Sequence, residues 1–365
     1  MRWSFPIGSL AGIRIELHVT FLLFLGWVAL FGWPPAPGLL RGDIASAASS
    51  VALVLLIFTC VLLHELGHAL AARRYGIRTR DIILLPIGGV ARLQRMPDRP
   101  LHEIVVAIAG PLVNVAIALL ITVALAATGR SPLDALEQGG VLGSLLAINV
   151  VMVAFNLIPA FPMDGGRVLR ALLALRLPYV RATRIASTIG QGIALLFGVV
   201  GFFYNPMLMF VALFVFLAAG EEQALVRTRA TLSGLPARAA MLSEFETLDV
   251  ADPLQRAVDL LMAGSQQEFP VLDQGRPLGV LSRNDLLRGL QKAGAHSPVG
   301  QAIAHDGLVA EPGEPLEFVF QRMREHGRSA LLVVSGGELV GLLTLENVSE
   351  LLLVQDALKR HAGSR

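Results

Sequence analysis

Two kinds of hydrophobic pattern divide the chain near residue 229. In residues 1–226, long apolar runs approach the ~20 residues that a membrane-spanning helix needs. We expect six such spans, at about 17–36, 47–72, 102–128, 141–163, 184–203 and 206–226. Residues 227–365 instead mix apolar and polar positions as an ordinary soluble domain does. The pattern therefore predicts a polytopic α-helical membrane domain over residues 1–229, followed by a soluble part.

Composition narrows the class of protein further. The 365 residues are 54% hydrophobic and 16% charged, whereas a typical soluble domain carries about 25% charged residues. A chain this apolar cannot hide its surface in one soluble core, and disorder and nucleic-acid binding are excluded as well. The single cysteine, Cys60, excludes a disulfide scaffold and a cysteine-rich metal site.

Arginines gather in alternate connections between the spans. Seven lie between residues 73 and 99, five lie between 167 and 184, and Arg227 and Arg229 follow the sixth span. The other connections are poor in arginine. Because positive charge stays on the cytoplasmic side, the distribution predicts a multi-pass protein of the cell membrane with six crossings and both termini cytoplasmic.

Three ionisable residues interrupt the second apolar run. His64 and His68 are four residues apart, so both imidazoles lie on one face of a helix, at the spacing of two zinc ligands. Glu65 lies beside them, where a carboxylate can accept a proton from a water that the metal activates. Hydrogen bonding to neighbouring helices, or a proton relay, is the alternative. Charge is so costly within an apolar span that we favour a catalytic zinc site.

A catalytic zinc ion needs a third protein ligand, and His102, Glu103 and Asp164 are the candidates near the cytoplasmic side. His102 and Glu103 resemble an ordinary helix start at the membrane surface. Asp164 follows two helix-breaking prolines and precedes Gly165-Gly166, so we favour Asp164.

Asn149 and Asn156 are seven residues apart, so they share one helix face that we expect to line the same cavity. Polar contact between helices is the alternative for this pair.

Three motifs in order resemble those of the site-2 protease family of intramembrane zinc metalloproteases. They are His64–His68, the segment Ala-Gly-Pro-Leu-Val-Asn at 109–114, and the segment from Asn156 to Gly166. The resemblance implies that His64, His68 and Asp164 bind one zinc ion and that Glu65 activates water. It also implies that the substrates are transmembrane segments, for which Asn149 and Asn156 would help to hold the chain or polarise its carbonyl.

The segment from residue 77 to 93 is similar to the membrane-dipping strands of that family. A free strand edge near the zinc, including Gly88 and Gly89, could hold an unwound substrate by backbone pairing. A plain basic loop at the lipid headgroups is the alternative.

The soluble part repeats itself at an offset of 62 residues, since residues 269–285 align with 331–347. Each copy predicts two strands around a glycine turn and then a helix, with another helix before the strands. The repeat resembles a tandem pair of CBS (cystathionine β-synthase) domains, at 230–295 and 296–357, followed by a flexible tail at 358–365. The predicted fold is thus six transmembrane helices with a cytoplasmic α/β CBS module.

The CBS resemblance implies an adenine nucleotide between the copies, as well as a homodimer through these domains. Ser282 and Thr344 would touch its phosphate and Asp285 its ribose, whereas Asn347 departs from the carboxylate expected in the second copy. Helix capping is the alternative role for Ser282 and Asp285.

Together these features predict an intramembrane zinc endopeptidase that acts on single-span membrane proteins in the lipid bilayer, as in regulated intramembrane proteolysis, with a ligand-sensing CBS pair. A CBS-regulated transporter or channel is one alternative, although it gives no reason for the zinc motif. A catalytically idle membrane scaffold is the other.

Overall fold

The computed structural model describes residues 3–32, 44–93, 99–138, 140–303 and 308–362. The chain forms two compact units, residues 1–224 and 225–365.

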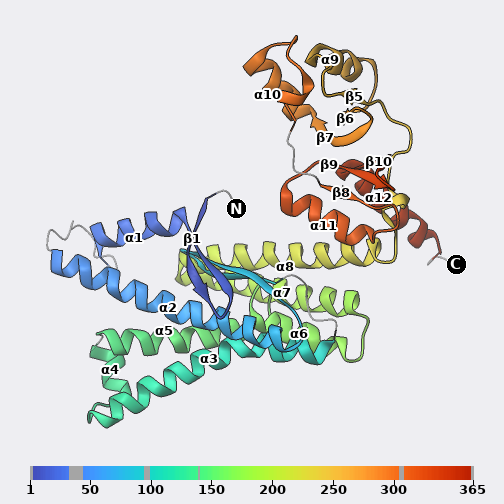
Figure 1. Cartoon of the computed structure of the whole chain (residues 1–365). Coiled ribbons are helices and arrows are strands. Elements are labelled where there is room, and N and C mark those ends of the chain that lie inside the picture. Colours follow the sequence, from blue (N-terminus) through green and yellow to red (C-terminus); the bar gives the residue numbers. More distant parts are fainter. Residues whose placement is uncertain (1–2, 33–43, 94–98, 139, 304–307, 363–365) are drawn as a thin grey trace. The chain divides into compact units, whose positions relative to one another are not determined.

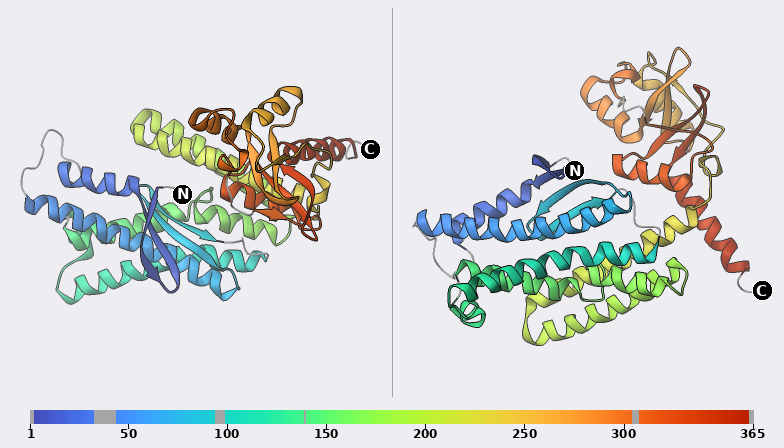
Figure 2. Two further views of the ribbon diagram at one scale, coloured as in Figure 1. Left: turned by 45° about the horizontal axis from the view of Figure 1, so that its top comes forward. Right: turned by 60° about the horizontal axis from the view of Figure 1, so that its bottom comes forward.

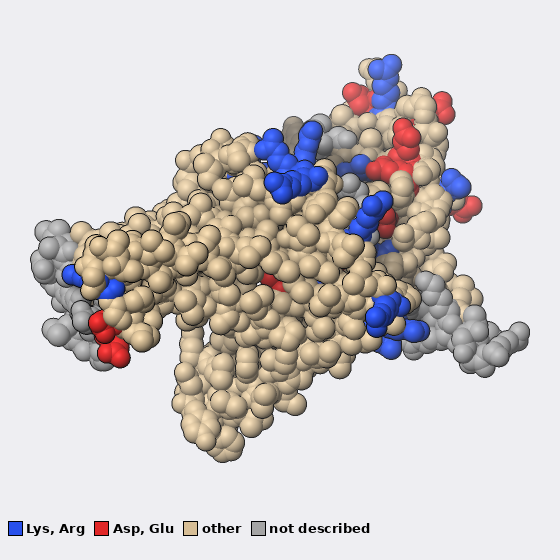
Figure 3. Space-filling model, turned by 90° about the horizontal axis from the view of Figure 1, so that it is seen from below, with Lys and Arg blue, Asp and Glu red and all other residues tan. Residues whose placement is uncertain are grey.

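Helices make up most of the first unit (Figure 1). They are α1 (Val19–Phe31), α2 (Ile44–Arg74), α3 (Pro100–Ala127), α4 (Pro132–Gln138), α5 (Val141–Asn156), α6 (Asp164–Ala174), α7 (Tyr179–Tyr204) and α8 (Pro206–Leu232), the last of which continues into the second unit. Large apolar side chains such as Leu195 and Phe210 are exposed on these helices. The broad middle of the face in Figure 3 carries almost no charged side chains. Such a surface suits lipid contact.

Among the described residues, four helices are long and apolar enough to cross a membrane: α2, α3, α7 and α8. The other two predicted spans are shorter apolar helices, α1 and α5, of 13 and 16 residues. Residues 33–36 of the first predicted span lie outside the described residues. The predicted span at 141–163 ends early, at Asn156, because Pro159 and Pro162 cannot donate a helical hydrogen bond.

A four-stranded sheet packs against α2. Its strands β1 (Ser4–Leu10), β2 (Ile13–His18), β3 (Thr79–Leu85) and β4 (Gly88–Leu93) lie in sequence order, with β2 and β3 parallel and the outer pairs antiparallel. Ile82 and Leu84 of β3 are buried against Ala69 of α2. Both β3 and β4 contact α2, and Figure 2 shows the sheet lying along this helix. In this strand order, β4 is an outer strand, and among the described residues it forms an edge of the sheet.

The second unit consists of two similar α/β halves. The first half has β5 (Leu248–Asp249), α9 (Leu254–Ala263), β6 (Glu268–Asp273), β7 (Arg276–Ser282) and α10 (Arg283–Ala293); the second has β8 (Val309–Ala310), α11 (Leu316–His326), β9 (Ala330–Ser335), β10 (Glu338–Thr344) and α12 (Leu345–Ala362). Glu268 pairs with Ser282 and, 62 residues later, Ala330 pairs with Thr344. Each half has its own apolar core. Helix α12 continues to Ala362, through most of the segment predicted as a flexible tail.

Candidate metal centre

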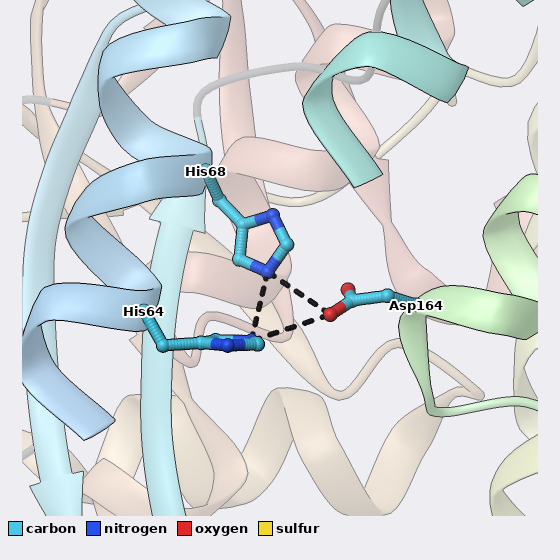
Figure 4. A group of neighbouring side chains, drawn as sticks. All are labelled: His64, His68 and Asp164. Atoms are coloured by element: carbon cyan, nitrogen blue, oxygen red, sulfur yellow. Dashed lines mark hydrogen bonds and ion pairs between the residues drawn. The ribbon is translucent and has the colours of Figure 1, made fainter. Parts of the chain in front are cut away.

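The structure brings His64, His68 and Asp164 together (Figure 4). Both histidines project from α2, and Asp164 is the first residue of α6. The two Nε2 atoms are 3.1 Å apart, and Asp164 Oδ2 lies 3.3 Å from His64 Nε2 and 3.1 Å from His68 Nε2. All three side chains are buried. Among the described residues, this is the one group of histidine, cysteine and acidic side chains arranged to hold a metal ion.

The separations suit zinc. Ligand atoms that surround a zinc ion tetrahedrally at about 2.0–2.1 Å lie about 3.3 Å from one another, and the observed distances are close to this value. His68 Nδ1 lies 2.7 Å from the carbonyl oxygen of Val106. Because a carbonyl only accepts, the proton is on Nδ1, and the Nε2 lone pair faces the other two ligand atoms. Three lone pairs that converge in a buried space favour a bound cation.

Two buried asparagines, Asn114 of α3 and Asn149 of α5, orient His64. His64 Nδ1 donates to Asn114 Oδ1 at 2.5 Å, Asn114 Nδ2 donates to Asn149 Oδ1 at 2.7 Å, and Asn149 Nδ2 donates to the Leu145 carbonyl at 2.8 Å. The chain of bonds fixes the imidazole tautomer and leaves Nε2 free for the metal. Sequence reasoning missed the role of Asn114, although this residue ends one of the three motifs.

Asn149 and Asn156 differ in their surroundings. Asn149 is fully buried and both atoms of its amide are engaged, which favours a supporting role over contact with substrate. Asn156 is half-buried and donates its amide to the Met152 carbonyl one turn earlier. The structure thus does not place the two amides in equivalent positions.

Gly110 of α3 makes room for the two imidazoles. A Cβ atom at this position would lie 2.2 Å from His68 Nε2 and 2.8 Å from His64 Nε2. At Gly67 of α2, a Cβ atom would lie 2.9 Å from the Ala109 carbonyl oxygen, so glycine also allows α2 and α3 to approach closely here. The geometry of the site therefore depends on the absence of a side chain at Gly110 and at Gly67.

A tight turn after α5 places Asp164. Gly165 packs so closely that a Cβ atom would lie 2.3 Å from the Ile158 carbonyl oxygen, and one at Gly166 would lie 2.6 Å from the Ala160 carbonyl carbon. The turn therefore accepts only glycine at these two positions without moving, which explains why both follow the ligand.

Glu65 of α2 contacts the edge strand β4. Its Oε2 accepts a hydrogen bond of 3.3 Å from the Ala91 N–H, and a Cβ atom at Gly89 would lie 2.6 Å from Glu65 Cγ. Gly88 has a φ of +135°, which other residues rarely adopt. The strand edge thus runs beside the carboxylate that is the candidate general base.

The two other candidate third ligands lie outside the group. The His102 ring stacks on Tyr75 with centroids 3.9 Å apart. Glu103 forms an ion pair with Arg170, their Oε1 and Nη2 atoms 2.5 Å apart.

In the second unit, a cavity of about 580 Å³ lies between the two halves. Ser282 and Asp285 line it, together with Gly327, Arg328 and Ser329 of the second half; Thr344 and Asn347 are not among its lining residues. Ser282 also caps α10, with its hydroxyl accepting from the Asp285 N–H at 3.2 Å and donating to Asp285 Oδ2 at 2.6 Å. Thr344 makes the equivalent contacts with Asn347. In the first half, Ser282 therefore both caps α10 and lines the cavity.

Comparisons with known proteins agree with this architecture. Residues 52–197 match the model of peptidase family M50, and residues 237–292 and 299–354 each match the CBS domain. The chain is 31% identical to the zinc metalloprotease MJ0392 of Methanocaldococcus jannaschii over 95% of this chain and 96% of that protein. It is 30% identical to Rip3 of Mycobacterium tuberculosis over 96% and 93%.

Among solved structures, the site-2 protease from Methanocaldococcus jannaschii is 36% identical and covers 60% of this chain and 95% of its own, with a TM-score of 0.45. CBSX2 in complex with AMP is 25% identical over 33% of this chain and 97% of its own, with a TM-score of 0.29. The 31% identity to MJ0392, which extends over 95% of this chain, establishes the protein family. The chain belongs to peptidase family M50, the site-2 protease family of multi-pass membrane zinc metalloproteases, and it carries a tandem pair of CBS domains.

Proposed function

We propose that this zinc metalloprotease cuts peptide bonds within the transmembrane segments of single-span membrane proteins, and that Glu65 is its general base. One observation carries the proposal: two histidines and a buried aspartate converge beside a glutamate in a helix that is apolar enough to cross the membrane. Such a site hydrolyses bonds at a depth that soluble proteases do not reach. A transporter or channel is not favoured, because ion transport gives no reason for the two histidines, the glutamate and the distant aspartate, and the similar full-length proteins are zinc metalloproteases.

In the proposed reaction, His64, His68 and Asp164 would hold the zinc ion, which would supply Lewis acidity. The Glu65 carboxylate accepts the proton of the attacking water and then returns a proton to the amide nitrogen that leaves. Its hydrogen bond to the Ala91 N–H orients the carboxylate. Asn114 and the Val106 carbonyl keep the imidazole protons on Nδ1, away from the metal side.

We further propose that the edge of β4 at Gly88 and Gly89 binds the unwound substrate by backbone hydrogen bonds. An edge strand beside Glu65 would present the scissile peptide to the base without requiring a particular side chain. We also assign Asn156, at the end of α5 and eight residues before Asp164, to substrate binding.

For the topology, we propose six crossings of the cell membrane with both termini cytoplasmic. The distribution of arginines supports it, since seven lie between residues 73 and 99 and five between 167 and 184. On this proposal, residues 1–229 form the protease domain, and 230–295 and 296–357 form two cytoplasmic CBS domains, through which the chain would pair as a homodimer.

The cavity between the CBS halves is our proposed site for an adenine nucleotide that regulates cleavage. Ser282 would contact phosphate and Asp285 the ribose hydroxyls. In the second half, Thr344 would be the equivalent phosphate contact, whereas Asn347 replaces the carboxylate that a second site would need. Calorimetry of the 225–365 fragment with AMP tests this, because that fragment has its own cores. Absence of heat at millimolar AMP would exclude sensing and leave a docking or dimerisation platform.

The proposed protease activity is tested by comparing membranes of cells that carry the wild-type chain with those of cells that carry Glu65→Gln. We expect one or a few single-span proteins to accumulate at full length with the variant, as quantified by mass spectrometry. Equal abundance of every single-span protein in the two cell lines, at equal expression of the chain, would instead support a catalytically idle scaffold.

A further inference from the structure

A fully buried arginine joins three helices of the first unit. Arg170 of α6 donates from Nε to Glu103 Oε1 of α3 at 2.8 Å, its Nη2 lies 2.5 Å from the same oxygen, and its Nη1 donates to Glu222 of α8. The guanidinium carbon also lies 4.9 Å from the ring centre of Phe161 and 5.0 Å from that of Tyr179. The guanidinium is therefore held by two carboxylates and lies close to two aromatic rings.

Such a cluster contributes little net stability, but it fixes the positions of the helices that it joins. Bringing a guanidinium and two carboxylates out of water is costly, so a buried ion pair often adds little net stability. The planar fork of arginine, however, binds a carboxylate at a fixed distance and angle. Glu103 is buried as well, whereas the Glu222 side chain is 24% exposed. The Arg170–Glu103 pair is thus the rigid part of the cluster and Glu222 its outer arm.

The helix that carries Arg170 begins with a metal ligand. Asp164 and Arg170 are six residues apart on α6, about 9 Å along the helix axis. This helix has 11 residues, so a shift of Arg170 moves the whole element, Asp164 included. Metal sites tolerate ligand displacements of about 0.2 Å. The attachment of α6 to its neighbours must therefore be more rigid than that of an ordinary surface helix.

One face of α3 contacts the surroundings of all three ligands. Glu103, Val106, Gly110 and Asn114 follow at intervals of three, four and four residues, so they lie on one stripe of the helix. Along this stripe, Glu103 binds Arg170, the Val106 carbonyl accepts from His68, Gly110 makes room for both rings, and Asn114 accepts from His64. Two of the three ligands are thus oriented directly by α3, and the third lies on the helix that α3 holds through Arg170.

We propose that Arg170 is the positioning residue for Asp164: gripped by Glu103 and Glu222, it fixes α6 against α3 so that the carboxylate meets the two imidazoles. The inference rests on the proposed role of Asp164 as zinc ligand. It assigns no contact between Arg170 and substrate, water or metal.

The test measures zinc affinity and the visible spectrum of the cobalt-substituted full-length protein in detergent, which reports ligand geometry apart from catalysis. The variants are Arg170→Lys and Arg170→Gln, with Arg176→Gln, an exposed arginine two residues beyond α6, as the matched control. We expect both Arg170 variants to bind zinc about 10- to 100-fold more weakly with altered cobalt spectra, and the control to match the wild type. Lysine keeps the charge but loses the fork, so a purely electrostatic role predicts that Arg170→Lys behaves like the wild type.

Two further variants, Glu222→Gln and Asp164→Asn, provide additional tests of the inference. If the Arg170 variants do not fold, Glu222→Gln removes only the outer arm, and we expect it to fold with zinc affinity reduced at least about threefold and a changed cobalt spectrum. Unchanged affinity and spectrum in every variant that folds would overturn the inference. Asp164→Asn separates this failure from a wider one, because an Asp164→Asn protein with full zinc affinity would refute the ligand assignment itself.

Discussion

Replacing Gly110 by alanine should empty the metal centre while leaving the fold intact. The added Cβ would lie 2.2 Å from His68 Nε2 and 2.8 Å from His64 Nε2. Ordinary van der Waals contact begins at about 3.4 Å, so the His68 ring must move by about 1.2 Å. That displacement is about six times the 0.2 Å that a metal site tolerates. The methyl group also occupies space beside both ligand nitrogens, so loss of at least one ligand follows.

The expected zinc affinity of Gly110→Ala is at least about 100-fold below that of the wild type, since even the loss of a supporting residue lowers metal affinity about 10- to 100-fold. Cleavage should fall with it. Zinc content is measured by mass spectrometry on the purified chain, and helical content by circular dichroism. The matched control is Gly192→Ala, which adds the same methyl to α7 with no atom from beyond its own turn of helix within 4 Å. Stoichiometric zinc and wild-type cleavage in Gly110→Ala would refute the geometry given for the site.

Three other outcomes follow from the same structure. Gly89→Ala places a Cβ atom 2.6 Å from Glu65 Cγ, so we expect kcat to fall by up to about 100-fold at unchanged zinc content, and equal kcat would show that β4 does not control Glu65. Asp285→Ala should weaken AMP binding to the 225–365 fragment by about 10- to 100-fold in calorimetry, as expected for loss of a charged hydrogen bond; unchanged affinity would place the ribose elsewhere. Burial raises the pKa of the Glu268 carboxyl, and a hydrogen bond from Ser329 offsets only part of this effect. The folded state therefore binds the proton more tightly than the unfolded state, and stability falls as pH rises above the ordinary value of 4.5. Glu268→Gln should then stabilise the fragment at pH 7 and lose this advantage near pH 4 in urea titrations, whereas a pH-independent difference would contradict the assignment.

The sequence predicted the three ligands, including Asp164 on a second element, whereas the residues that support these ligands from other helices needed the structure. The four-residue interval between His64 and His68 is a property of one helix, and the prolines before Asp164 indicate a break in another. Asn114 lies 50 residues from His64, and a buried asparagine in an apolar helix carries no mark of its partner. The sequence likewise suggested only that Glu103 belongs to a helix start at the membrane surface, because its partner Arg170 is 67 residues away.

The two shorter apolar helices, α1 and α5, show a different limit of predicting helices from hydropathy. Hydropathy measures how apolar a run is, but it does not register where the backbone stops being helical. The apolar stretch continues through Pro159 to Met163, whereas α5 ends at Asn156. Conversely, the 62-residue repeat predicted the strand pairs and helices of the second unit, because the turn glycines and capping residues are local signals.

The most direct test of the account is cleavage of a purified single-span substrate in liposomes by the wild-type chain and by Glu65→Gln, with zinc measured in both. The account predicts about one zinc ion per chain in each protein, and products from the wild type only, whose masses place the cut within the apolar segment of the substrate. Cleavage by Glu65→Gln at the wild-type rate, or a wild-type chain that cleaves fully after its zinc has been removed, would contradict it.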